Sequence, residues 1–491
     1  MIQPDFRTFC HLAKRGNLVP VYETFTADLL TPVGAYLRIA RDARYAFLLE
    51  SVEGGETIAR YTFVGANPVE VFRARGRNCT LESGNKQKQF EANPLEELRR
   101  LTLRFKPVRV SGLPPFISGA IGYCAYDMVR LMETIPATGR DDMALDDCVM
   151  MFYLGVLAFD HVQHRVWITR NVFVDGDCDL QEEYDSAVRE IARLRRLLEN
   201  ESPPQKRTRR AQTVKVRSNM SRAQFMAGVR KAKEYIRAGD VFQVVPSQRF
   251  SAEISADPFD IYRALRVVNP SPYMYFLRLD DVAVVGSSPE MLVKVQKRDV
   301  FYRPIAGTLP RGRDEKQDRE FEARLLADPK ERAEHIMLVD LGRNDLGRVC
   351  EYGSVKVERL LFVERYSHVM HLVSTLRGKL REGLDCFDAL MACFPAGTLS
   401  GAPKIRAMEI IDELEPTRRG TYGGAILYLD FSGNIDSCIA LRTLVAKNGR
   451  AYIQAGAGIV ADSIPEKEYM ETVNKARAVI AALEIAHGKG A

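Results

Sequence analysis

Apolar residues recur at helical spacing in several stretches of the chain. The clearest is 179–199, where charged residues separate the apolar positions Leu180, Tyr184, Val188, Ile191, Leu194 and Leu198. A second helix is predicted after Ser221, which forms a capping-box pattern with Gln224, and is expected to end at Gly239. Two more helices are predicted over 329–346 and from residue 465, the latter capped by Ser463.

Short runs rich in apolar, aromatic and β-branched residues predict strands between and before these helices. They cover 45–49, 60–64, 148–159, 165–169 and 241–245. The run 148–159 is the most apolar of the chain. It is shorter than the roughly 20 residues that cross a bilayer, so it predicts a buried strand and no membrane span.

The composition is that of a globular protein. Of 491 residues, 46% are hydrophobic and 27% charged, and the net charge is only +6, which excludes general disorder and gives no sign of nucleic-acid or membrane binding. Nine cysteines occur without a Cys-x-x-Cys pair, which indicates reduced thiols and a cytoplasmic location. A polar, prolyl and basic stretch over 201–217 predicts a linker between a strand-rich part, 1–200, and a second part, 218–491.

Two of the predicted helices carry polar stripes that contain carboxylates. On the last helix the stripe falls at i, i+3, i+4 and i+7, at Glu468, Glu471, Thr472 and Lys475. On the helix over 329–346 it comprises Glu331, Glu334 and His335. Carboxylates from two helices fit a hard divalent ion such as Mg²⁺, which prefers oxygen ligands and retains waters. A solvated surface with ion pairs is the alternative that spacing leaves open.

Three other segments are candidates for close contact with an anion or a metal. The small-residue stretch 395–404 ends in Lys404 and is suited to cradling an anion, although it lacks the spacing of a Walker loop. Gly456 and Gly458 indicate a close backbone approach without forming a dinucleotide fingerprint. His368 and His371 stand at i, i+3, but without a His-Glu-x-x-His pattern at least one of them is better read as structural.

Four motifs in order resemble those of the chorismate-utilising enzymes. They are Pro304-Ile305-Ala306-Gly307-Thr308, residues 333–345, residues 395–404 and residues 456–471. That family comprises anthranilate synthase component I, aminodeoxychorismate synthase component I, and the isochorismate and salicylate synthases. The resemblance implies an α/β fold of the α+β type, with two large, mostly antiparallel sheets stacked face to face and helices outside.

The resemblance also implies roles for individual residues. Glu334 and Glu471 match the Mg²⁺ ligands, and Glu290 matches the acid that protonates the departing C4 hydroxyl. Thr398 matches a hydroxyl that lines the site, and His371 a histidine that acts in the later elimination. Chorismate itself would be contacted by Tyr422, Arg442, Gly456, Gly458, Lys475, Ala306, Gly307 and Thr308.

Two positions discriminate within the family. Members that add water to chorismate carry a general-base Lys where this chain has Gln243, a neutral amide that tolerates ammonia as the nucleophile. Many aminodeoxychorismate synthases carry a nucleophilic Lys where this chain has Ala306. The resemblance is therefore to the anthranilate synthases, which convert chorismate and ammonia to anthranilate and pyruvate in tryptophan biosynthesis. The alternative is an aminodeoxychorismate synthase component I, which serves folate synthesis.

Resemblance in the first half of the chain points to a regulatory pocket for L-tryptophan. Its two walls would be formed by Glu50, Ser51, Asn269, Pro272, Tyr273 and Met274. A plain core strand that reaches a loop is the competing interpretation of 48–51, and a tryptophan pocket retained by some aminodeoxychorismate synthases would look the same.

No glutamine amidotransferase module with its Cys and His is recognisable in the sequence. By resemblance, a separate glutaminase subunit, component II, would deliver ammonia, and the two would form a heterotetramer. A rival of another class, a non-catalytic module that binds nucleic acid through Arg207–Arg210, predicts no loss of function when Glu334 or Glu471 becomes Gln.

Overall fold

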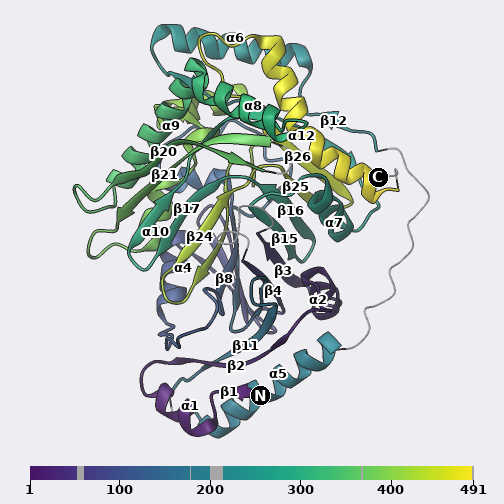
Figure 1. Ribbon diagram of the computed structural model, residues 1–491, viewed down its shortest axis with the longest axis vertical. Coiled ribbons are helices and arrows are strands. Elements are labelled where there is room, and N and C mark those ends of the chain that lie inside the picture. Colours follow the sequence, from purple (N-terminus) through teal and green to yellow (C-terminus); the bar gives the residue numbers. More distant parts are fainter. Residues whose placement is uncertain (52–59, 177, 200–213, 367–368, 489–491) are drawn as a thin grey trace.

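The computed structural model describes residues 1–51, 60–176, 178–199, 214–366 and 369–488 (Figure 1). Two sheets dominate, each of twelve strands and built from antiparallel pairs. The expected class, two large antiparallel sheets with helices outside them, is confirmed.

The first sheet contains strands from both halves of the chain. Its order is β1 (Ile2–Gln3), β2 (Leu18–Thr26), β11 (Arg165–Phe173), β10 (Leu157–Asp160), β4 (Tyr61–Ala66), β3 (Tyr45–Glu50), β15 (Tyr273–Leu279), β16 (Val282–Ser288), β25 (Thr443–Lys447), β26 (Arg450–Gly456), β14 (Ser247–Glu253) and β12 (Arg217–Ser218).

The second sheet lies against the first. Its order is β19 (Ile305–Pro310), β21 (Val369–Lys379), β18 (Asp299–Tyr302), β17 (Met291–Gln296), β24 (Ile435–Ile439), β23 (Ala425–Asp430), β8 (Gly119–Cys124), β9 (Cys148–Tyr153), β5 (Glu70–Arg75), β6 (Asn78–Ser83) and β7 (Lys86–Glu91), and β20 (Lys356–Arg365) pairs with β21. A separate pair joins β13 (Gln243–Val244) to β22 (Gly401–Ala402).

Helices cover the outer faces and one end of the sheets (Figure 1). They are α1 (Phe6–Ala13), α2 (Pro32–Ile39), α4 (Pro94–Leu103), α5 (Leu180–Glu199), α6 (Arg222–Ala238), α7 (Pro258–Val268), α8 (Glu315–Ala327), α9 (Pro329–Gly347), α10 (Cys386–Cys393), α11 (Lys404–Leu414) and α12 (Pro465–Ala486). No helix in the described ranges combines the length and apolar character that a membrane crossing needs.

Alternation of side chains along the strands produces the layers. On β15, Tyr275 and Leu277 join a buried cluster shared by both sheets, whereas Met274 and Phe276 join the cluster under the outer helices. This follows from the period of two along a strand, which sends neighbouring side chains to opposite faces. The apolar side chains of β15 therefore pack into two separate hydrophobic cores, one on each face of the sheet.

Both sheets combine strands from both parts of the chain. β3 pairs with β15 in the first sheet, and β8 pairs with β23 in the second. The predicted boundary thus separates two stretches of sequence, while each sheet is shared between them. The predicted linker lies outside the described residues up to 213, and its last residue, Arg217, begins β12.

Three details of the predicted elements differ. The run 148–159 forms two strands, β9 in the second sheet and β10 in the first, because the chain crosses between the sheets near Gly155. The strand expected over 241–245 is only two residues long. Ser463 does not cap α12; Ile464 is the N-cap residue, and the Ser463 hydroxyl accepts a hydrogen bond from the Val460 N–H.

Candidate active site between the sheets and the covering helices

Glu290 lies in the short connection from β16 in the first sheet to β17 in the second. Its side chain is 5% exposed. Burial raises the pKa of its carboxyl to about 8, although contacts with Thr398, the Ile305 N–H and Lys475 act in the opposite direction. Glu290 is therefore largely protonated at neutral pH, which is the state of a proton donor.

The Thr398 hydroxyl lies next to this carboxyl. It is near enough to lower the pKa of Glu290, yet it makes no hydrogen bond of good geometry and is otherwise without a partner among the described residues. We interpret the two groups as neighbours with a poorly aligned contact. Thr398 belongs to the short 3₁₀ turn Gly397–Leu399, which packs against α9.

His371 on β21 faces the strand that carries the first motif. Its Nδ1 lies 2.9 Å from the Thr308 hydroxyl and 3.2 Å from the Gly307 carbonyl oxygen. A carbonyl can only accept, so the contact with Gly307 places the ring proton on Nδ1 and leaves Nε2 as a base. Burial, followed by the charge of Arg442, lowers the pKa of His371 to about 4.

Tyr422, Gly456 and Lys475 meet at the end of β26. The Lys475 ammonium donates to the Gly456 carbonyl oxygen at 3.2 Å and pairs with Glu471 at 2.7 Å. A Cβ on Gly456 would stand 2.8 Å from both the Pro246 carbonyl oxygen and the Tyr422 hydroxyl. Glycine is therefore required here by the close approach of its neighbours.

Gln243 and Gly458 form a second close contact in the same region. Gln243 is 3% exposed, and its Oε1 has no hydrogen-bond partner among the described residues. A Cβ on Gly458 would lie 2.9 Å from the Gln243 Nε2. A buried acceptor without a partner is costly, and a ligand with N–H groups would satisfy it.

Arg442 is half-buried and has φ of 46°, in the left-handed region. Few residues other than glycine adopt this conformation, and such residues cluster at functional sites. Its charge reaches His371, whose pKa it helps to lower. On β19, Gly307 also has a positive φ, of 57°, and Ala306 lies beside it.

The carboxylates of α9 and α12 are close enough to perturb each other. Burial and then the Glu331 charge raise the pKa of Glu334, and Glu471 contributes as well. Burial also raises the pKa of Glu468. Within the described ranges no three potential ligands are gathered into a preformed metal cluster. The donor set nevertheless fits Mg²⁺, which often takes one or two protein carboxylates together with substrate oxygens and waters.

Several candidates from the sequence are engaged elsewhere. Lys404, the cation of the expected anion cradle, pairs with Asp345 at 2.8 Å. Thr472 is buried and bonded to Gln248 at 2.6 Å. His335 is fully buried and lies 2.7 Å from the Ser374 hydroxyl. His368 lies outside the described residues.

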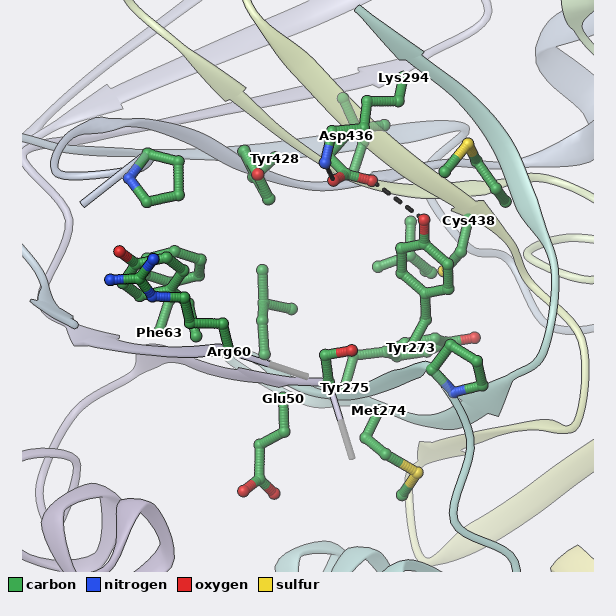
Figure 2. Close-up of a pocket in the computed structure, with 18 of the residues that line it drawn as sticks. Glu50, Arg60, Phe63, Tyr273, Met274, Tyr275, Lys294, Tyr428, Asp436 and Cys438 are labelled. Carbon is green, nitrogen blue, oxygen red and sulfur yellow. Dashed lines mark hydrogen bonds and ion pairs between the residues drawn. The ribbon is translucent and has the colours of Figure 1, made fainter. Parts of the chain in front are cut away.

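A cavity of about 660 Å³ lies between the two sheets, next to the candidate active site (Figure 2). Ser51, Pro272 and Tyr273 line it, and the buried Ser51 hydroxyl has no partner among the described residues. Glu50 and Met274 also border the cavity, but their side chains extend to the other face of their sheet (Figure 2).

Glu50 and Asn269, two of the expected pocket residues, contact other parts of the protein. Glu50 accepts a hydrogen bond from Tyr262 and pairs with Arg266 at 3.0 Å, both from α7. Asn269 is not among the residues that line the cavity; it ends α7, and its amide donates to Ser287 at 3.4 Å.

One polar group in the wall of the cavity has no signal in the sequence. Asp436 on β24 accepts from the Tyr273 hydroxyl at 3.2 Å and pairs with Lys294 at 2.8 Å (Figure 2). Tyr428 and Cys438 complete this wall. Asp436, Tyr428 and Cys438 lie on the paired strands β23 and β24. Tyr273 and Lys294 come from strands far away in the chain, and no local pattern links them to Asp436.

Comparisons with known proteins agree on one family. Residues 44–481 match the model of the chorismate binding enzymes. The chain is 48% identical over 491 residues to anthranilate synthase component 1 of Acetivibrio thermocellus, covering 99% of each chain. It is 45% identical to the protein of that name from Synechocystis sp., covering 98% of this chain and 99% of that protein.

A solved structure gives the same result. The crystal structure of anthranilate synthase component I from Streptococcus pneumoniae TIGR4 superposes with a TM-score of 0.77 at 37% identity, covering 93% of this chain and 99% of that one. The family model and these alignments span most of the molecule, including both sheets and the cluster around Glu290. The chain belongs to the chorismate-binding enzymes, the family that its sequence motifs resemble.

Proposed function

We propose that this chain is component I of an anthranilate synthase, a lyase of tryptophan biosynthesis that converts chorismate and ammonia to anthranilate and pyruvate. The observation that carries the proposal is the alignment, over nearly the whole chain, with relatives named anthranilate synthase component 1 at 42–48% identity. The residues at the discriminating positions, Gln243 and Ala306, support amination by free ammonia.

In this mechanism Glu290 donates a proton to the leaving C4 hydroxyl, because hydroxide is a poor leaving group. Its buried carboxyl keeps the proton to about pH 8. The Gln243 Oε1, unpaired and buried, accepts from ammonia and orients its lone pair toward C2. His371, neutral and with its ring proton on Nδ1, removes the C2 proton through Nε2 when pyruvate leaves.

Substrate carboxylates are held by the remaining candidates. Arg442 and Tyr422 contact the enolpyruvyl carboxylate, for which a planar guanidinium is well shaped. Lys475 and the backbone at Gly456 and Gly458 lie beside the ring carboxylate. Glu334 and Glu471 would hold Mg²⁺, which when bound neutralises the charge of that carboxylate.

Ammonia is supplied in this proposal by a glutaminase partner, component II, in a heterotetramer. The name component 1 of the relatives is consistent with a second component. The proposed setting is cytoplasmic, in line with the nine cysteines, which are all free.

The cavity between the sheets is proposed to bind L-tryptophan as a feedback inhibitor. Its aromatic walls suit an indole, and the Ser51 hydroxyl and the Asp436–Lys294 pair offer partners for an amino-acid head group. Of the six residues expected from the sequence, Glu50, Ser51, Pro272, Tyr273 and Met274 line the cavity. Ser51, Pro272 and Tyr273 are proposed as the side-chain contacts. Glu50 would have an indirect role, because its contacts with α7 hold strand β3 in place.

The test is an assay of the purified chain with chorismate, Mg²⁺ and an ammonium salt, followed by anthranilate fluorescence with and without tryptophan. Fluorescence that tryptophan suppresses is the expected result. Chorismate loss without fluorescence would instead indicate an aminodeoxychorismate synthase. Full activity in excess chelator would contradict the metal, and activity unchanged at saturating tryptophan would contradict the inhibitor site.

A further inference from the structure

Behind the candidate active site lies a fully buried ion pair that no catalytic step uses. Arg419 and Glu415 are 2% and 5% exposed, and their closest N–O distance is 2.6 Å. Glu415 follows the end of α11, and Arg419 lies one turn further along the loop that leads to Tyr422. Burying both charges is expensive unless every donor and acceptor is satisfied.

The guanidinium of Arg419 lies over the ring of Tyr126, 4.6 Å from its centroid, and the hydrogen bonds of the pair to other residues reach segments of the site. Arg419 donates to the Leu399 carbonyl oxygen at 2.7 Å and to the Val245 carbonyl oxygen at 2.6 Å. Glu415 accepts from the N–H of Ser247 at 2.8 Å and from its hydroxyl at 2.7 Å. The guanidinium also lies over the Tyr422 ring, 5.4 Å from its centroid.

Each of these segments carries a residue assigned to the reaction. Leu399 follows Thr398, and Val245 comes two residues after Gln243. Ser247 is the strand partner of Gly456. A single guanidinium–carboxylate pair therefore holds the backbone that positions Thr398, Gln243, Tyr422 and Gly456.

We infer that Arg419 and Glu415 are positioning residues, which fix four walls of the chorismate site relative to one another. The inference rests on the proposed function. A planar guanidinium has donors in a rigid fork, so it can join two carbonyl oxygens and a carboxylate in fixed directions. A lysine ammonium is a point charge at the end of a flexible stem and cannot reproduce that geometry.

The fold supplies a matched control one turn away. On the same helix α11, Asp412 pairs with Arg130 at 2.6 Å, and both side chains are largely buried. This second pair binds Thr138 and the Ile135 carbonyl oxygen, in the segment after η1 (Tyr126–Leu131). None of its described partners carries a residue assigned to the reaction.

The experiment compares Arg419→Lys with Arg130→Lys in the full chain, by thermal unfolding and by steady-state kinetics with chorismate and ammonium. We expect similar losses of stability. Only Arg419→Lys should raise the chorismate KM and reduce kcat/KM, by about tenfold or more, since small misplacements of site groups cost rates of that size. A purely structural role would lower the amount of folded enzyme and leave KM unchanged.

A second pair of variants, with smaller changes, tests the inference if the arginine variants do not fold. Ser247→Ala removes one hydroxyl from Glu415, and Thr138→Ala removes one from Asp412. The inference predicts a raised chorismate KM for Ser247→Ala alone. Normal kinetics in the folded Ser247→Ala and Arg419→Lys proteins would overturn the inference. An equal rise of the chorismate KM in the controls, Thr138→Ala and Arg130→Lys, would overturn it too. A wild type that does not consume chorismate would overturn the proposed function as well, and this is seen before any variant is made.

Discussion

Glu290 and His371 are both held in their neutral forms by the same cause. Burial disfavours charge, so it raises the pKa of the carboxyl to about 8 and lowers the pKa of the imidazole to about 4. At neutral pH the site therefore offers a proton donor and a base, without a charge on either. Paired groups whose environments move their pKa values apart are typical of acid–base catalysts.

The first prediction concerns the pH dependence of Glu290. Its carboxyl is protonated below about pH 8 and ionised above it, so kcat should fall as the pH rises through 8. Rates are compared at constant free ammonia, because ammonium itself titrates. Glu290→Gln should lower kcat by about 10²- to 10⁴-fold, the usual contribution of a general acid. A kcat that still rises above pH 9 would contradict this role.

The same shift makes a prediction for stability. The pKa of Glu290 in the folded state lies above its ordinary value of 4.5, so the folded protein holds a proton that the unfolded chain has lost. Stability from this group is complete below about pH 4.5 and lost as the pH rises to about 8. The Tm of Glu290→Gln relative to wild type should therefore increase from pH 5 to pH 9. A Tm difference between the two proteins that stays constant from pH 5 to pH 9 would show that the Glu290 carboxyl titrates normally in the folded state.

At the scale of elements, α9 and α12 each contribute carboxylates to one place. Glu334→Gln should raise the Mg²⁺ concentration for half-maximal activity at least about tenfold, because it removes one of the two proposed protein ligands. Glu466→Gln, an exposed change in the first turn of α12, is the control and should leave the titration unchanged. An identical Mg²⁺ titration in the wild type, Glu334→Gln and Glu466→Gln would exclude Glu334 as a ligand.

The end of β26 gives a second prediction at this scale. Gly456→Ala places a Cβ 2.8 Å from the Pro246 carbonyl oxygen, which forces β14 and β26 apart or displaces Tyr422. We expect kcat/KM for chorismate to fall by about 10²-fold, as for other small displacements of site groups, with the far-ultraviolet circular dichroism unchanged. Near-normal kinetics of Gly456→Ala would show that the end of β26 accommodates a Cβ without displacing the groups of the site.

Which elements could be predicted depended on whether their signals are local. The capping box of Ser221 and Gln224 and the stop at Gly239 are properties of adjacent residues, and α6 forms as expected. The N-cap of α12 is Ile464, one residue after the predicted Ser463, because Ser463 uses its hydroxyl to close the preceding loop. The run 148–159 predicts one strand, because its hydrophobicity does not reveal that β9 and β10 belong to different sheets.

At the scale of the whole molecule, the site depends on strands that are distant in the sequence. Motif resemblance predicts roles for Glu290, His371 and Gln243, but their mutual arrangement comes from the order of strands, which no local pattern specifies. The same holds for Asp436 and Lys294 in the cavity between the sheets. Arg419 and Glu415 are close in sequence, but the segments that they join are not. The sequence predicts a strand over 45–49 and none around Met274, and it does not indicate which face of the sheet Glu50 and Met274 occupy.

The wall shared by the cavity and Glu290 yields the last prediction. Pro289 and Met291, on either side of Glu290, line the cavity, and so does Ile305, whose N–H contacts the Glu290 carboxyl. A ligand that fills the cavity therefore presses on the backbone that holds the acid. Met291→Ala should leave tryptophan binding within about threefold of wild type by calorimetry, since one side chain among many is lost, yet weaken inhibition at saturating tryptophan.

Leu113 provides the matched control, because it lines the same cavity from the loop before β8, away from the Glu290 connection. Leu113→Ala removes a side chain of similar size, so it should change affinity to a similar extent and keep full inhibition at saturation. Equal residual activity in the two variants would mean that the inhibitor acts through the cavity as a whole. Weaker inhibition confined to Met291→Ala would locate the coupling in the connection between β16 and β17, the point at which the chain passes from one sheet to the other.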